Sequence, residues 1–564
     1  MQKAAPYIQR LLSVKGKFSD AATAEKTALL QQLQQLPLTD TSLVKKYHDC
    51  LLFLQACPGN RHMLQLAHHE MERLCNAAAT IFNRTSVQKQ TALNGTGIYG
   101  TTHVSTFSFE INDWLLQNFD TAVSLHSSGA GNETINSILE LLLPRKEYQL
   151  VTQPQCSLPQ HIHKLNGNNN NHSSLRWLLQ TLQQQYSSAE LRDHLFNQLN
   201  VFTTWKLEHP FFNRSCARAL PLNKIHFYKK EFTLKNAGRY IRKKIKPPVV
   251  LTEAAKKNLL DTARTILALH YREIDTVSYC DPAAVTYFDM GHGISIALFT
   301  MLPQHRFSIE SYIGYMAFVN SVPAAYGGGW LLGHRCKIGI NIFPALRGGN
   351  SSLVFAAVLR LYHGHYHANR FVVKPYQFGK NNADGLRSGA FWFYYKLGFR
   401  PVTAALKKMA ADENEKKQQQ PDYRTPVAVL KQFTAAPVEL VLDKNSYPVY
   451  DGGDISKAIT NAIIKNFEGN REKALQYCKK ELQKLMAAHA IKIKPAALSL
   501  LNKQLLWMLL LKDNNNCFSF TKTAATQLVK LLVAKFGTDE REYILQLQEN
   551  KKLWQLLQSH ILTP

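Results

Sequence analysis

The sequence lacks the cysteine pattern of a disulfide framework or a zinc site. Its nine cysteines are scattered over 564 residues, their number is odd, and no two are spaced as Cys-x-x-Cys. Disulfide-rich domains and zinc knuckles need paired or closely spaced cysteines. We therefore expect reduced thiols, most of them buried, and no metal centre.

The sequence also has no long apolar run. The longest, LLWMLLL at residues 505–511, is much shorter than the ~20 residues that cross a bilayer. The first residues, MQKAAPYIQRLL, lack the apolar core of a secretory signal. These absences predict a cytoplasmic protein without a transmembrane segment.

Acidic residues are scarce, because Asp and Glu number 40 against 67 Lys and Arg, which gives a formal net charge of +27. Such an excess attracts polyanions such as nucleic acid or anionic lipid surfaces. The densest basic stretch, residues 224–248, holds nine Lys and Arg, one Glu and interleaved aromatics. The stretch has the composition of a solvated linker ahead of Pro247 and Pro248, and a polyanion contact through residues 224–246 is the alternative interpretation.

The length implies several folding units, because one hydrophobic core seldom serves 564 residues. Apolar residues at three- and four-residue spacing predict helices in residues 1–84 and again in residues 446–564. Residues 85–248 have a mixed pattern from which no role can be inferred. In the first region His68, His69 and Glu70 lack the His-Glu-x-x-His spacing of a zinc helix, so a solvated helix face is expected there.

Residues 249–445 mix helical and strand patterns. A helix over 251–271 precedes four stretches rich in β-branched and aromatic residues, at 284–290, 293–301, 309–319 and 337–343. A helix over 351–363, a strand over 370–378, an aromatic helix and a last strand over 438–443 follow. The order predicts an α+β fold, in which a central mixed sheet is flanked by helices and the N- and C-terminal regions are helical.

The segment INIFPALRGGNSSLVFAAVLRL, residues 340–361, has the pattern of a strand, a turn with Gly348 and Gly349, and a helix. Backbone N–H groups at a helix start are unpaired and lie at the positive end of the helix dipole, so they can hold a phosphate. Arg347 adds a fixed positive charge. Such a turn is more often structural, so a second motif is needed to indicate a function.

The second motif is AFWFYYKLGF, residues 390–399. The two stretches resemble the GNAT superfamily of acyl-CoA-dependent N-acyltransferases, whose members often carry V-x-P-x-x-R-x-x-G-x-G/A and then A-x-x-F-Y-x-K-L-G-F. Ile342, Pro344 and Arg347 fit the first motif. The fixed places of the second are filled by Ala390, Phe393, Tyr394, Lys396, Leu397, Gly398 and Phe399. The resemblance covers residues 249–445 and implies transfer of an acyl group from acetyl-CoA, or another acyl-CoA, to an unidentified amine.

The resemblance also implies roles for single residues. Tyr394 would protonate the departing thiolate, because a phenol with a pKa of about 10 is a suitable donor to a thiolate. The backbone of Asn341, Ile342 and Phe343 would pair with the pantetheine amides, as an added strand does. The other expected cofactor contacts are Arg347, Gly348, Gly349, Asn350, Ser351, Ser352, Asn382 and Arg387.

Two departures from the family pattern stand near these positions. Asn350 and Ser352 replace the later small residues of the first motif, and Arg387 replaces an Asn that many relatives place seven residues before the tyrosine. Asn381 and Asn382 lie near enough to substitute for that Asn.

No pattern marks the general base that an amine acceptor requires. We expect Glu310 in that role, with Asp289 and His292 as alternatives, because all three lie on or beside predicted strands. Two other functions remain open. One is a non-catalytic acyl-CoA-binding or protein-interaction protein with a GNAT-like fold, and the other is a nucleic-acid-associated protein that uses residues 224–246.

Overall fold

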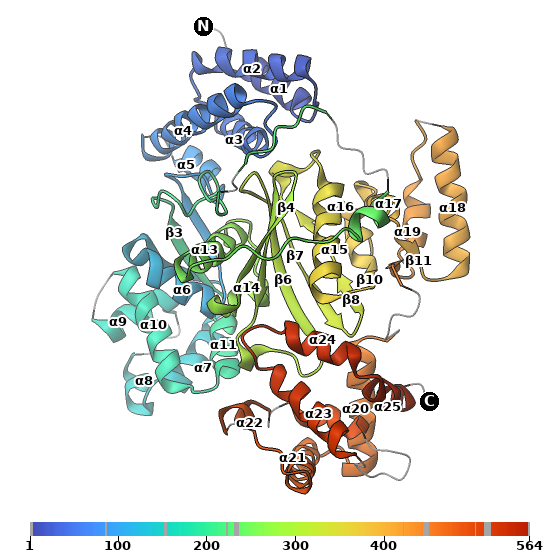
Figure 1. Ribbon diagram of the computed structural model, residues 1–564. Coiled ribbons are helices and arrows are strands. Elements are labelled where there is room, and N and C mark those ends of the chain that lie inside the picture. Colours follow the sequence, from blue (N-terminus) through green and yellow to red (C-terminus); the bar gives the residue numbers. More distant parts are fainter. Residues whose placement is uncertain are drawn as a thin grey trace.

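The structure of the chain is a computed structural model, which describes residues 4–84, 87–151, 155–167, 170–221, 224–230, 236–420, 422–443, 450–493, 495–501, 504–511 and 520–561. A central sheet is surrounded by an N-terminal group of helices, a smaller mixed unit and a C-terminal group of helices (Figure 1). The fold is therefore α+β with helical terminal regions, which confirms the fold class predicted from the sequence.

The N-terminal region consists of helices α1 (Ala5–Val14), α2 (Asp20–Gln34), α3 (Thr41–Ala56), α4 (Arg61–Arg84) and α5 (Val87–Leu93). The side chains of Ser19 and Asp40 cap α2 and α3 by accepting hydrogen bonds from first-turn N–H groups. The Glu70 side chain on α4 is 1% exposed, and its carboxylate accepts hydrogen bonds from Tyr47 Oη (2.6 Å) and Arg73 Nη2 (2.8 Å). The prediction of a solvated helix face is therefore wrong for Glu70. Its hydrogen bonds from Tyr47 and Arg73 compensate the cost of burying the carboxylate.

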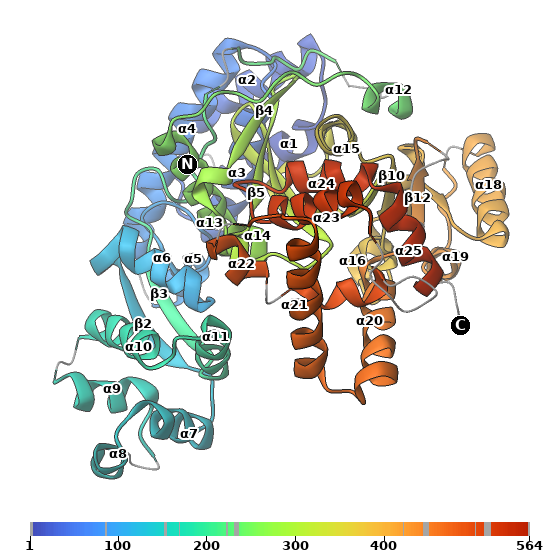
Figure 2. The ribbon, with the colours of Figure 1, turned by 60° about the horizontal axis from the view of Figure 1, so that its bottom comes forward.

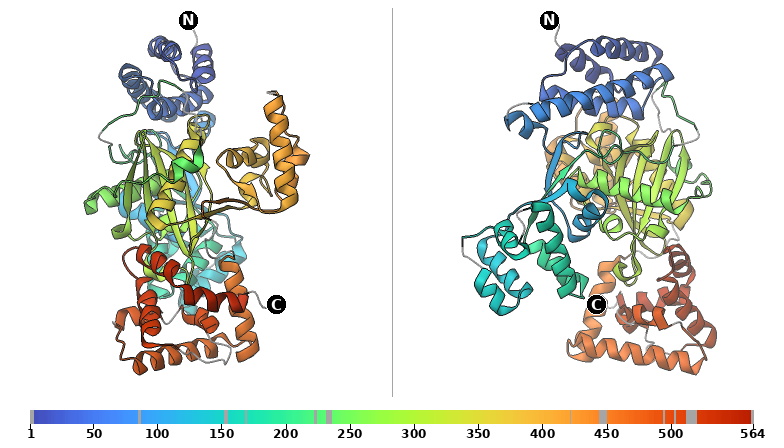
Figure 3. Two further views of the ribbon diagram at one scale, coloured as in Figure 1. Left: turned by 45° about the vertical axis from the view of Figure 1, so that its right-hand side comes forward. Right: turned by 90° about the vertical axis from the view of Figure 1, so that its left-hand side faces the viewer.

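The second region folds around its own small sheet. The strands β1 (Thr102–Thr106), β2 (Val123–Ser128) and β3 (Val201–Lys206) pair antiparallel in the order β1-β3-β2. The helices around them are α6 (Phe109–Phe119), α7 (Asn132–Leu142), α8 (Arg145–Val151), α9 (Leu158–Asn166), α10 (Asn171–Gln185) and α11 (Ala189–Gln198). The core of this unit includes Trp114, Phe119 and Trp205, and the unit projects to one side of the central sheet (Figure 3).

The central sheet has the strand order β11-β12-β10-β8-β7-β6-β5-β4, with β9 paired to β7. Its strands are β4 (Thr286–Gly291), β5 (Ile294–Thr300), β6 (Ser311–Val319), β7 (Val322–Leu332), β8 (Arg335–Ile338), β9 (Asn341–Ile342), β10 (Arg370–Val373), β11 (Arg400–Pro401) and β12 (Val438–Val441). Strands β4 to β8 run as an antiparallel meander. Strand β10 joins β8 in parallel, because the connecting helix α15 (Ser351–Tyr366) crosses over between them.

Helices cover both faces of the sheet. Neighbouring residues of a strand point to opposite faces. A Cβ at Gly329 of β7 would meet the Tyr362 ring of α15, so α15 covers that face. The next residue along the strand, Gly328, faces the opposite side, and so does its cross-strand partner Gly314 of β6. A Cβ at Gly314 would meet Thr276 of α14 (Asp275–Ser278), the helix that follows α13 (Glu253–Ala268). Helices α13 and α14 therefore lie on the face opposite α15.

The sequence patterns predicted β4, β5, β6 and the β8–β9 segment but missed β7, which has 11 residues and is the longest described strand of the sheet. Three successive glycines, residues 327–329, lower the β-propensity of this stretch. In the folded chain they make room for aromatic groups of both faces, because added Cβ atoms would lie 2.4–2.7 Å from Tyr312, Tyr315 and Tyr362. The tertiary packing thus explains the glycines.

After β10 the chain forms α16 (Ala383–Arg387), α17 (Ala390–Lys396), α18 (Ala404–Gln419) and α19 (Val427–Phe433) before it enters β12. Helix α17 is the aromatic helix. The Phe391 ring stacks on Phe433 of α19 with a centroid distance of 4.0 Å, and Trp392 Nε1 donates to Thr425 Oγ1 (3.1 Å). These contacts fix α17 against α19, and the Phe391 ring also packs on Phe378, in the turn that follows β10, with a centroid distance of 5.9 Å.

The C-terminal region contains α20 (Gly452–Phe467), α21 (Arg471–Ala488), α22 (Pro495–Leu501), α23 (Lys522–Ala534), α24 (Arg541–Glu549) and α25 (Lys551–Ile561). The apolar run at Leu505–Leu511 is a buried 3-10 helix among them. A buried polar cluster joins this region to the sheet, since Lys535 Nζ donates to Glu540 and to Ser311 Oγ at the start of β6. Within the described residues, no helix has both the length and the apolar character needed to cross a membrane.

Candidate functional site

The candidate site is a fork between two parallel strands. β10 pairs with β8 only from Arg370 to Val372, opposite Arg335 to Lys337. Beyond Ile338 the chain bends toward β7, where Ile342 of β9 pairs with Ala325. Among the described strands none pairs with β9 on its other side. An opening at the carboxyl ends of adjacent parallel strands is the usual position of a ligand in open sheets that contain such strands.

The predicted strand, turn and helix lie at the mouth of this fork. The chain leaves β9, forms a 3-10 turn at Pro344–Leu346 and enters α15 at Ser351. Gly348 has φ +83°, a conformation that favours glycine, and an added Cβ there would meet open space. Asn350 precedes α15 but makes no side-chain cap, and the Ser351 N–H donates to the Gly349 carbonyl (2.9 Å), so the N–H groups of Ser352 and Leu353 are the ones without a side-chain cap.

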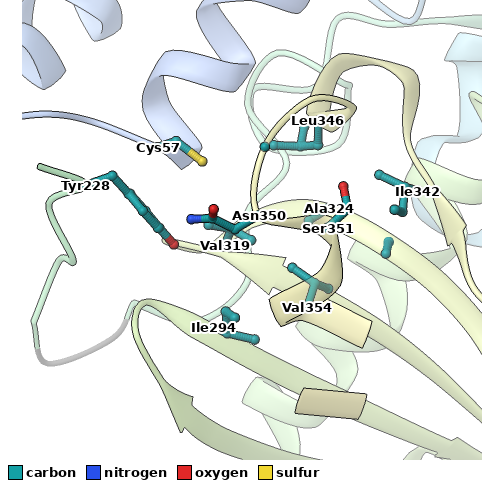
Figure 4. Close-up of a pocket in the computed structure, with 12 residues that line it drawn as sticks. Cys57, Tyr228, Ile294, Val319, Ala324, Ile342, Leu346, Asn350, Ser351 and Val354 are labelled. Carbon is teal, nitrogen blue, oxygen red and sulfur yellow. The ribbon is translucent and has the colours of Figure 1, made fainter. Parts of the chain in front are cut away.

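One side of the turn is closed by the N-terminal region. A Cβ at Gly349 would lie 3.2 Å from the ring of Phe53 on α3. Cys57 and Tyr228 face Asn350 and Leu346 across a cavity of about 20 Å³, too small for a cofactor (Figure 4). A ligand must therefore approach the turn from the other side, where Arg347 is exposed and Ser352 is half-buried, because the Gly348 carbonyl lies 3.1 Å from the ideal Cβ position of Gly16 in the N-terminal region.

Two arginines lie on this open side. Arg387 of α16 forms an ion pair with Asp384, and both side chains are largely exposed. The hydrogen bond from Arg387 lowers the pKa of the Asp384 carboxyl, and the charge of Arg347 lowers it further, so Arg347 lies close to this pair. The charges of Arg347 and Arg387 thus both act on the Asp384 carboxyl, although 39 residues separate the two arginines along the chain.

Tyr394 lies inside the fork, and its side chain is buried. The Ile340 N–H, between β8 and β9, donates to Tyr394 Oη, which itself lies 3.4 Å from Gln377 Oε1. Burial raises the pKa of the phenol, while the Ile340 N–H lowers it by a smaller amount. Tyr394 is therefore neutral at physiological pH, with its hydroxyl at the point where β8 and β10 separate.

Gln377 is a residue of the fork that the sequence analysis missed. It follows β10 in the turn Pro375–Phe378. The Gln377 amide lies only 2.8 Å from the position that a Cβ of Gly339 would occupy, so a larger residue at 339 would clash with it. Gly339 therefore permits close approach of the two branches of the fork. No pattern marks Gln377, since its position depends on where β10 ends.

The structure does not bring Glu310 to the fork, and this corrects its choice as the general base. The Glu310 carboxylate lies 3.5 Å from Lys337 Nζ, and Lys337 lies over the ring of Trp330 on the face opposite α15. Tyr394 packs instead against Phe355 of α15. Glu310 also contacts Gly452 at the start of α20, so its place is at the junction with the C-terminal region.

The alternative bases lie farther away. Asp289 and His292 belong to β4 and to the turn after it, and four inter-strand spacings separate β4 from β8, roughly 19 Å. Asp289 forms an ion pair with Lys246 at 3.1 Å. The backbone carbonyl of His292 accepts a hydrogen bond from Tyr228 Oη at 2.9 Å. Neither residue is placed to take a proton at the fork.

The remaining predicted cofactor residues divide into exposed and structural positions. Asn341 is exposed and Ile342 is half-buried. The Phe343 ring is buried against Tyr326 and His270, so only its backbone is available. Asn382 caps α16 by accepting from Gly385 N–H (3.1 Å) and donates to the Tyr376 carbonyl (2.9 Å). Its amide is thus committed to the loop that carries Arg387.

A scan against known protein families, a search of curated proteins and a search of solved structures each found no match to this chain. The functional argument therefore depends on the two motifs and on the geometry of the fork. Among the described residues no group of three His, Cys, Asp or Glu side chains is arranged to hold a metal ion.

Proposed function

We propose that the protein is an acyl-CoA-dependent N-acyltransferase. The observation that carries this proposal is the coincidence of three features at one fork. The strands β8 and β10 separate there, the glycine turn and the start of α15 form its mouth, and Tyr394 lies where the strands part. The second and third features lie in the two stretches that resemble motifs of the GNAT superfamily.

The proposed cofactor position follows from charge and pairing. The uncapped start of α15, together with the charges of Arg347 and Arg387, favours the pyrophosphate of an acyl-CoA on the open side of the turn. The edge of β9 that faces β10 has no strand partner among the described residues, so its backbone is free to pair with pantetheine amides. Acetyl-CoA is the simplest candidate.

The proposed reaction is direct transfer. A neutral amine attacks the thioester carbonyl, and backbone N–H groups of the β8–β9 segment stabilise the tetrahedral intermediate. The C–S bond then breaks, and Tyr394 Oη donates a proton to the thiolate. Because burial raises its pKa, Tyr394 holds this proton throughout the physiological range. The amine loses its own proton to water, since none of the three predicted bases lies at the fork.

A non-catalytic acyl-CoA-binding protein is the second candidate, and one observation favours it. The N-terminal helices pack directly on the glycine turn through Phe53. A change in the turn on cofactor binding would therefore alter the packing of the N-terminal region. This arrangement suits a sensor as well as an enzyme.

Release of free CoA distinguishes the two candidates. The purified protein is incubated with acetyl-CoA and a panel of polyamines, amino acids and lysine peptides, and the free thiol is measured with a chromogenic disulfide. Release that depends on one acceptor class supports the enzyme. Binding of acetyl-CoA without acceptor-dependent release from any member of the panel supports the sensor. The acceptor class and the cytoplasmic location remain predictions.

A further inference from the structure

The basic stretch forms a loop that leaves the sheet edge and returns to it. We call its described residues, 224–230 and 236–246, the basic loop. Lys224 and Lys246, at its two ends, line the same cavity of about 790 Å³ beside β4. Between them the chain passes the N-terminal region and forms the short helix α12 (Ala237–Ile241) next to α15 (Figure 2). The solvated linker expected from the composition is therefore an anchored surface loop.

The backbone of the basic loop is held at several points. The Asn320 side chain accepts from His226 N–H and donates to its carbonyl, both at 2.9 Å, and Tyr228 N–H donates to the Pro58 carbonyl (2.8 Å). Farther along, Arg360 of α15 donates to the carbonyls of Lys243 and Lys244. These anchors use backbone groups and leave the lysine side chains of the loop free to face solvent.

The exposed side chains of the basic loop are almost all cationic. The described part contains no Asp or Glu. Its exposed cations are Lys224, Lys229, Lys230, Arg239, Arg242, Lys243, Lys244 and Lys246. Among the described residues only Lys246 of this set has an ion-pair partner, Asp289. The loop therefore presents up to eight positive charges, and seven of them have no carboxylate of the described residues within ion-pair distance.

We propose that the basic loop binds the phosphodiester backbone of a nucleic acid. Closely spaced lysines without acidic partners neutralise successive phosphates and release their counterions, which is the main source of sequence-independent affinity. Charge also attracts an anionic bilayer, but stable interfacial binding adds the apolar face of an amphipathic helix to that charge. In α12 the apolar residues Ala237, Tyr240 and Ile241 are buried. This inference does not depend on acyl-CoA binding.

Salt dependence tests the proposal. Binding of a fluorescent single-stranded RNA and of an RNA duplex is measured by anisotropy over a series of salt concentrations. The test variant carries Lys229→Ala, Lys230→Ala, Lys243→Ala and Lys244→Ala. Since each lost phosphate contact lowers the slope of log K against log salt by about 0.7 for a single strand, the slope should fall by up to about 3.

A matched control removes the same charge elsewhere. Lys457, Lys465, Lys473 and Lys480 are exposed on α20 and α21, and their replacement by Ala should leave the slope unchanged. Equal slopes for test and control variants would overturn the proposal, as would no binding to either RNA at low salt. Binding to phosphatidylserine vesicles but to neither RNA would overturn it in favour of a membrane contact.

Discussion

Replacement of Tyr394 by Phe removes one oxygen atom from the centre of the fork, and its effect can be worked out from the contacts of that atom. A positioned proton donor contributes about 10²- to 10⁴-fold to a rate, which at about 1.4 kcal/mol per decade equals ~3–5 kcal/mol of transition-state stabilisation. Tyr394→Phe should therefore lower kcat by at least about 100-fold. Acyl-CoA affinity should change little, since the partners of the hydroxyl are Ile340 and Gln377.

The same substitution has a separate cost in stability. It leaves the Ile340 N–H without its acceptor, and a buried unsatisfied group costs about 1–3 kcal/mol. Unfolding in urea measures this loss independently of activity. A proton donor must be protonated to act, so its contribution is present below its pKa. Because burial raises the pKa of Tyr394 above 10, kcat should show no basic limb attributable to this residue below pH 10.

The assay compares kcat, from free-thiol release with an active acceptor, and the acyl-CoA Kd, from calorimetry. Tyr395→Phe is the matched control, because it removes the same atom from the neighbouring, half-buried tyrosine. Unchanged kcat in Tyr394→Phe would refute the role of proton donor and leave Tyr394 as a packing residue. A parallel loss of acyl-CoA binding would show that the variant disturbs the site as a whole.

Two further predictions concern stability. The His103 ring is 0% exposed and burial lowers its pKa from 6.5 to about 4, so between these values the unfolded chain binds more protons and stability falls as the pH falls. The free energy of unfolding should be ~2 kcal/mol lower at pH 5 than at neutral pH because of His103. His103→Leu should remove this difference when urea unfolding is compared at pH 7 and pH 5. An unchanged pH dependence in the variant would contradict the role given to His103. Glu540→Gln leaves the buried Lys535 charge uncompensated and should cost about 3–5 kcal/mol in thermal or urea unfolding. The double variant Lys535→Met, Glu540→Leu should recover only part of that stability, because Arg306, 3.9 Å from Glu540 and equally buried, still loses its carboxylate partner; a greater loss in the double variant would contradict this explanation.

The sequence was sufficient where local pattern determines structure. Apolar periodicity predicted the terminal helices, and the strand, turn and helix at residues 340–361 have the predicted order. Arg347 and Arg387 were both predicted as cofactor contacts. That both charges act on Asp384 depends on how α16 folds relative to the turn, which no local signal specifies.

The missed features depend on contacts between distant residues. Strand β7 was missed because residues 327–329 look like a turn until the rings on both faces are known. Glu310 seemed a suitable base because it lies beside a strand, but the side chain of Lys337 and the start of α20 determine its actual surroundings. Gln377 enters the fork only because β10 ends at Val373.

Calorimetric titration with acetyl-CoA and longer acyl-CoAs tests the central claim most directly. Arg347→Glu reverses a charge at the open side of the turn, and Ser352→Asp places a carboxylate in the first turn of α15, where it favours the helix but repels a phosphate. Gly349→Asp is unsuitable, because its side chain would meet Phe53. Lys407→Glu, on the exposed part of α18, is the control with the same charge change.

The account predicts that the wild type and Lys407→Glu bind an acyl-CoA, whereas Arg347→Glu and Ser352→Asp each bind it at least about tenfold more weakly, a loss of ~1.4 kcal/mol. No binding of any acyl-CoA to the wild type, or equal binding by all four proteins, would contradict the placement of the cofactor at the fork.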